Sequence, residues 1–132
     1  MQKTQIKSFR DLEVYRNTYQ NAITASKEVL PKLPESEKFD LKDQLSRSTK
    51  AVPRLIAEGY AKRHQKSGFQ KYLDDAMAEC NETIVGLEMC RDIHNLDSKL
   101  CNDLVDKYDK SGRQIYLLAK AWSGFKDDRR NR

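Results

Sequence analysis

The sequence predicts an all-α protein, a single domain over residues 1–132 that folds as an antiparallel, up-down-up-down four-helix bundle. Three observations predict this fold. Apolar residues recur at spacings of three and four in four segments of the chain. Only 5 glycines and 3 prolines are present, far fewer turn residues than a β-sandwich or β-barrel needs. The composition, 38% hydrophobic and 34% charged, provides one apolar core beneath a heavily charged surface.

The first helix is predicted over residues 9–30. Ser8 and Asp11 have the spacing of a capping box, with aspartate in place of the usual glutamate. Pro31 ends the helix, because proline lacks an amide hydrogen and clashes with the preceding turn. The row of positions expected to face the core, called the seam, consists of Leu12, Tyr15, Tyr19, Ala22, Ser26, Val29 and Leu33.

The second helix is predicted over residues 36–62. Pro53 lies inside its seam, removes one amide donor and frees a carbonyl one turn earlier. We therefore expect a kink between Thr49 and Pro53. The seam consists of Leu41, Leu45, Ser48, Val52, Leu55 and Gly59, and Ile56 widens it.

The third and fourth helices are predicted over residues 68–94 and 98–123. Ser67 is the expected cap of the third helix, and Asp97 or Ser98 that of the fourth. The connections between helices are short, which favours antiparallel neighbours. The charged residues 126–132 are expected to form a frayed tail. The two seams are Leu73, Ala76, Cys80, Thr83, Leu87 and Cys90, then Leu100, Leu104, Tyr108, Ser111, Ile115, Leu118 and Trp122.

Several classes of function lack any sequence support. No apolar run approaches the length of a membrane span, and the first residues lack the apolar core of a signal peptide, so we expect a cytoplasmic protein without a membrane partner. The 3 cysteines include no CxxC pair, and the 2 histidines have no zinc-ligand spacing. Phosphate-binding and nucleophile motifs are also missing. We predict no catalytic residue, no metal and no cofactor, and we interpret Cys80 and Cys90 as core residues.

The charge is unevenly distributed along the chain. Residues 41–73 hold 8 basic and 2 acidic side chains, whereas residues 74–109 hold 3 basic and 10 acidic ones. The basic residues of the second helix share one helix face. Such a row could bind phosphates, form a subunit interface, or simply be solvated and paired with the acidic helices. Tyr60 is the nearest aromatic residue for base stacking. The candidate nucleic-acid-binding residues, called the basic stripe, are Arg47, Lys50, Arg54, Lys62, Arg63 and Lys66.

Four blocks of residues along the chain form a recognisable pattern. The first block is the set Phe9, Leu12, Val14 and Tyr15. The second runs from Leu41 to Ser48 and includes Gln44-Leu45, and the third is the Ile-Ala-Glu-Gly tetrad from Ile56 to Gly59. The fourth block consists of Phe69, Tyr72 and Leu73. With these blocks the chain resembles the 23S rRNA intervening-sequence protein family over roughly residues 8–122.

This resemblance implies a four-helix bundle that assembles as a ring, commonly a homopentamer, without enzymatic activity or cofactor. A related group, the accessory proteins of diversity-generating retroelements, binds nucleic acid and a reverse transcriptase through basic surfaces. The resemblance therefore implies three partners: further copies of the chain, RNA or DNA, and a protein such as a reverse transcriptase. We expect a non-catalytic assembly with affinity for nucleic acid. The alternative is a protein-interaction scaffold whose basic surface serves only subunit contacts.

Overall fold

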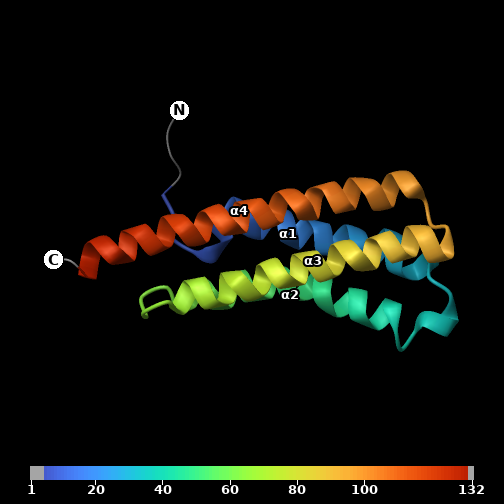
Figure 1. The fold of residues 1–132 in the computed structure, drawn as a ribbon, viewed down its shortest axis with the longest axis horizontal. Coiled ribbons are helices and arrows are strands. Elements are labelled where there is room, and N and C mark those ends of the chain that lie inside the picture. Colours follow the sequence, from blue (N-terminus) through green and yellow to red (C-terminus); the bar gives the residue numbers. More distant parts are fainter. Residues whose placement is uncertain (1–4, 131–132) are drawn as a thin grey trace.

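The computed structural model describes residues 5–130, with side chains as far as Trp122. In this range the chain forms four α-helices and no strand: α1 (Glu13–Thr24), α2 (Leu41–Ala61), α3 (Gly68–His94) and α4 (Ser98–Arg130). Successive helices run in opposite directions along one elongated bundle (Figure 1). α3 packs extensively against both α2 and α4, and α1 contacts α2 and α4. The predicted all-α four-helix bundle is confirmed.

The α-helical part of the first segment starts later than the predicted residue 9. The capping box is present, and the Asp11 carboxylate accepts hydrogen bonds from two backbone amides at 2.8 and 3.0 Å. These bonds cap a 3₁₀ turn over Phe9–Asp11 rather than an α-helix. Leu12 then adopts an extended backbone (φ −75°, ψ 121°), and α1 begins only at Glu13.

The first helix also changes character before the predicted end at residue 30. Its backbone widens into a π turn over Ala25–Val29 and then tightens into a 3₁₀ turn over Leu30–Lys32. Pro31 accounts for this change, because it has no amide hydrogen for the carbonyl four residues earlier.

The α-helical part of the second segment begins at Leu41, not at residue 36. Glu35–Glu37 form a 3₁₀ turn behind Pro34. The Glu37 carboxylate accepts the amide of Leu41 at 3.4 Å and lies 2.6 Å from Nε2 of His94, at the end of α3. The side chain of Glu37 therefore links the start of α2 to the C-terminal end of α3.

The third helix spans the predicted residues 68–94, but its start differs from the prediction. Ser67 has a positive φ of 56°, and its side chain makes no capping hydrogen bond. At the other end, Asn95 is also left-handed (φ 55°), a conformation that commonly ends helices.

The fourth helix starts where predicted and continues past residue 123. Asp97 is its cap, because its Oδ1 accepts the amide of Lys99 at 2.9 Å. The helical backbone reaches Arg130 through most of the predicted tail, since no proline interrupts it. Residues 131–132 of the predicted tail 126–132 lie outside the described residues. None of the helices in residues 5–130 combines the length and the apolarity that crossing a membrane would require.

The core lies between the seams of α2, α3 and α4, largely as predicted, and residues of the first segment such as Val14 and Val29 complete it. Two polar seam residues, Ser48 and Thr83, are buried there with their hydroxyl oxygens 2.8 Å apart, so each satisfies the other. The largest fully buried side chains include Tyr108, Phe69, Leu45, Ile56, Leu73, Leu87, Leu104 and Ile115.

The predicted seam of α1 is partly wrong. Tyr19 is 53% exposed, and Tyr15 is only half-buried. The side chains that pack inward include Val14 and Thr18 on α1 and Ala25 in the following π turn. Thr18 is accommodated in the interior because its hydroxyl donates to the carbonyl of Val14 at 2.8 Å. As a result, an apolar stripe of α1 is left on the outside of the bundle.

Candidate nucleic-acid interface

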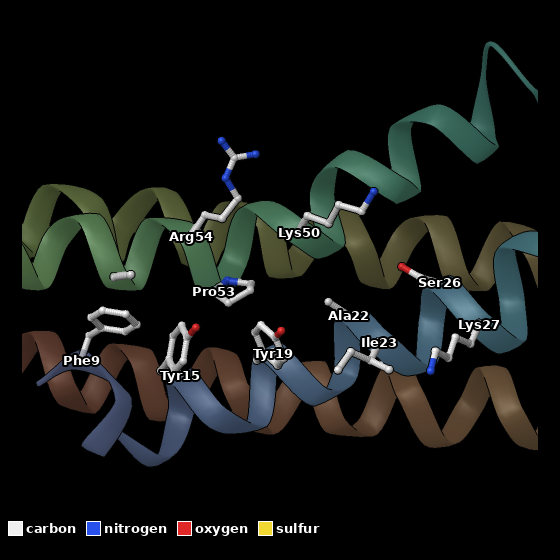
Figure 2. Close-up of a pocket in the computed structure, with 11 residues that line it drawn as sticks. Phe9, Tyr15, Tyr19, Ala22, Ile23, Ser26, Lys27, Lys50, Pro53 and Arg54 are labelled. Atoms are coloured by element: carbon white, nitrogen blue, oxygen red, sulfur yellow. The ribbon is translucent and has the colours of Figure 1, made fainter.

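An open apolar groove of about 450 Å³ lies between α1 and α2, on the outside of the bundle (Figure 2). The outward stripe of α1 forms one wall, and α2 forms the other. The residues that define this α1–α2 groove include Phe9, Tyr15, Tyr19, Ile23, Pro53 and Ala57.

Three aromatic rings form a row along the α1 side of the groove (Figure 2). The rings of Phe9 and Tyr15 meet edge to face, with centroids 4.8 Å apart and planes at 80°. The rings of Tyr15 and Tyr19 are 6.0 Å apart and tilted by 38°. Because Tyr19 is half-exposed, the row ends in a ring that a ligand can reach.

Pro53 forms part of the opposite wall and lies at a bend of α2. The helix continues through Pro53, yet it changes direction beside Lys50 (Figure 2). This position falls in the interval where the kink is predicted. The buried Pro53 ring points from α2 toward the tyrosines of α1 (Figure 2).

Basic side chains line the rim of the α1–α2 groove. Lys50 and Arg54 are exposed on α2, and neither forms an ion pair among the described side chains. Lys27 lies at the rim on the α1 side (Figure 2). Among the side chains that the structure describes, no acidic one lines the groove. The rim therefore carries positive charge that no described side chain of the groove balances.

Arg47, predicted as part of the same stripe, is paired within the bundle. Its guanidinium lies 3.2 Å from the carboxylate of Asp43, one turn earlier. Burial and the neighbouring Glu82 raise the pKa of Glu79 on α3, and the attraction of Arg47 partly offsets this rise. Intramolecular pairing, one of the three alternatives for the basic stripe, therefore applies to Arg47.

The remaining residues of the stripe lie at the end of α2 and in the α2–α3 loop. Lys62 donates to the hydroxyl of Tyr72 at 2.6 Å, a bond that raises the pKa of the lysine. Arg63 donates to the carbonyl of Tyr60 at 2.8 Å, and its guanidinium lies 4.0 Å from the centre of that ring. Lys66 is exposed. Since the partners of Lys62 and Arg63 are neutral, these bonds position the two cations without cancelling their charge.

Tyr60, the aromatic residue expected nearest the stripe, offers no surface for base stacking. It is 7% exposed and packs edge to face against Phe69 and Trp122, at 6.0 and 6.2 Å between ring centroids. The aromatic residues beside Lys50 and Arg54 come from α1 instead, and sequence reasoning placed them in the core. One feature of the sequence could have indicated that these aromatic residues face outward: α1 has more apolar residues than the single face that packs on the core can hold.

The cysteines form no candidate site. Cys80, Cys90 and Cys101 are buried and free. Burial raises the pKa of Cys80 and of Cys90 to about 12, so both thiols stay protonated at neutral pH. Among the residues whose side chains are described, no group of three or more histidine, cysteine, aspartate or glutamate residues is placed to hold a metal ion.

The fold defines an all-α four-helix-bundle protein with an apolar groove between α1 and α2. The family model of the 23S rRNA-intervening sequence protein matches residues 10–117, and the chain belongs to this family. A solved structure, from Bacteroides thetaiotaomicron, is of a protein with unknown function from the S23 ribosomal protein family. It matches with a TM-score of 0.72 and 18% identity, over 81% of this chain and 98% of that one, which shows a shared fold. A comparison with curated proteins found no match.

Proposed function

We propose that this protein is a non-catalytic, oligomeric protein of the cytoplasm that binds RNA or DNA through the basic stripe. One observation carries the proposal: five of the six stripe residues form no ion pair with any acidic side chain that the structure describes. These five cations are Lys50, Arg54, Lys62, Arg63 and Lys66.

Cations of this kind bind nucleic acid by displacing counterions from phosphates, which makes the affinity fall steeply with salt. Phosphate contacts also carry little sequence information, so binding is expected to tolerate many sequences. One subunit offers few contacts. A ring of subunits, commonly a pentamer in the family that the chain resembles, would repeat them and raise the avidity. A protein partner with an acidic surface, such as a reverse transcriptase, would use the same cations.

The alternative function is a protein-interaction scaffold in which the basic stripe serves only subunit contacts. One observation favours it. α3 exposes Val85, Met89 and Ile93 at helical spacing, next to acidic residues such as Glu82 and Asp92. This surface complements an apolar groove with a basic rim.

A charge-reversal experiment tests the proposal. Lys50, Arg54 and Lys66 are changed together to Glu, and binding to a fluorescent RNA is measured by anisotropy over a series of salt concentrations. We expect the variant to lose most of its binding and its salt slope to fall by about 2 per subunit, as for three lost phosphate contacts with a single strand. The matched control changes Lys107, Lys110 and Lys120, all exposed on α4, to Glu and should retain binding.

The outcomes separate the two functions. A parent protein that binds no RNA at ~50 mM salt, where such contacts are strong, would overturn the proposal. So would a stripe variant that binds as well as the parent. If light scattering shows that the stripe variant falls apart while the α4 control remains assembled, the stripe is a subunit contact and the scaffold function is favoured.

A further inference from the structure

The outward stripe of α1 is not explained by phosphate binding alone. A helix on the surface of a bundle normally turns polar side chains to solvent. Here Tyr15 and Tyr19 instead line a groove of about 450 Å³, with Pro53 on the opposite wall. A grooved apolar surface of this kind commonly marks a binding site. Its ligand must therefore bring apolar groups to the groove.

The rim further restricts the ligand to one that carries negative charge. Lys27, Lys50 and Arg54 lie at the edge of the apolar walls, and no acidic side chain from residues 5–122 lines them. A nucleic acid strand combines flat, apolar ring faces with closely spaced phosphates. In a duplex the ring faces are stacked inside and cannot be reached, whereas the phosphates, the sugars and the base edges are exposed. An unpaired strand can turn its bases outward to stack on aromatic side chains while its backbone follows a basic groove.

We infer that the α1–α2 groove binds the bases of single-stranded nucleic acid. Tyr19 is the stacking surface, backed by Tyr15, and Lys50 and Arg54 hold the neighbouring phosphates. The inference rests on the proposed function and narrows it from nucleic acid in general to unpaired strands. Such binding tolerates many sequences, because every base has a face that can stack.

The test compares two tyrosines of equal exposure. Tyr19 is 53% exposed in the groove, and Tyr116 is 55% exposed on α4. Each is changed to Ala, and anisotropy measures binding to an oligouridylate of ~12 nucleotides and to an RNA duplex of similar length. We expect Tyr19→Ala to weaken single-strand binding roughly 5- to 150-fold, the range for loss of one base–aromatic stack. Its duplex binding should not change, and Tyr116→Ala should bind both probes as the parent does.

Two further variants separate stacking from simple apolar contact. Tyr19→Phe retains the ring and should bind the single strand like the parent. Tyr19→Leu retains only apolar bulk and should bind like Tyr19→Ala. If Leu restores binding as fully as Phe does, the groove does not stack bases and the inference is wrong.

The remaining outcomes distinguish this inference from the proposed function. If Tyr19→Ala binds the single strand as tightly as the parent while salt-dependent binding persists, the base site is overturned and the phosphate-binding function stands. A parent that binds neither probe at ~50 mM salt overturns the proposed function itself. If Tyr19→Ala lowers the mass measured by light scattering, the groove holds a second copy of the chain and the inference fails.

Discussion

Glu37 and His94 show how one pair of side chains joins distant parts of the bundle. They are 57 positions apart in sequence, and their carboxylate and imidazole lie 2.6 Å apart. Both side chains are less than one-fifth exposed. The hydrogen bond from His94 lowers the pKa of Glu37 below its ordinary value of 4.5, so the folded protein favours the charged carboxylate.

The pH dependence of stability follows from this shift. Because the pKa of Glu37 is lowered on folding, its carboxylate stabilises the folded protein above pH 4.5. This stabilisation is lost as the pH falls through the lower pKa of the folded state. We expect Glu37→Gln to lower the free energy of unfolding near pH 6, and the effect to shrink as the pH falls below 4.5. Urea unfolding over this range measures it.

Glu35 provides the control for this experiment. Its side chain is 82% exposed, and its carboxylate lies 3.7 Å from Lys38 in a surface ion pair. Such pairs contribute little to stability, so Glu35→Gln should leave the free energy of unfolding nearly unchanged at every pH. A Glu37→Gln effect that does not change with pH would contradict the assigned role of the carboxylate.

Among the elements, α2 packs closely against α3 at Gly59. A Cβ at this position would lie 2.6 Å from the Cβ of Tyr72 and 3.0 Å from the ring of Phe69. Gly59→Ala should therefore lower the free energy of unfolding by ~1–3 kcal/mol through overpacking, although alanine favours a helix over glycine by ~1 kcal/mol.

Gly112 on α4 is the matched control, because a Cβ there would meet nothing within 4 Å. Gly112→Ala should raise the free energy of unfolding by up to ~1 kcal/mol. Denaturant unfolding of the two variants measures both effects. Shifts of the same sign and size in the two variants would show that close packing at Gly59 is not the cause.

The buried face could be predicted from the sequence for α3 but not for α1. The seam of α3 is fully buried, so spacing alone predicted which face packs inward. In α1 two faces compete, and counting apolar residues favours the one with Tyr15 and Tyr19. The structure buries Thr18 instead, because a hydroxyl bonded to its own helix backbone is compatible with the interior.

The same limit applies to the candidate site. Helical spacing predicted that Lys50 and Arg54 lie together on α2, because both belong to the same helix and are four residues apart. The groove beside them could not be predicted, because its other wall comes from α1. The bond of Lys62 to Tyr72 likewise joins the end of α2 to α3.

For the whole molecule, segregated charge and the exposed apolar side chains of α3 predict self-association. The basic stretch 41–73 and the acidic stretch 74–109 form neighbouring helices, and α3 exposes Met89 and Ile93 to solvent. Unlike surfaces that pair between copies generate a ring when the rotation closes. We expect a closed oligomer, a pentamer by the family resemblance. Light scattering coupled to gel filtration should give a multiple of 15.4 kDa, and a mass of 15.4 kDa alone would contradict it.

The loose attachment of α1 has a consequence for how the native state opens. α1 packs less extensively on its neighbours than α2, α3 and α4 do on theirs, and irregular turns flank it at both ends. Local opening should therefore release α1 first, and its amides should exchange with deuterium faster than those of α3. A ligand that fills the α1–α2 groove touches both walls and opposes this opening. Mass-spectrometric exchange should then show Glu13–Thr24 slowing on binding while α3 is unaffected, so the least protected helix reports whether the groove is occupied.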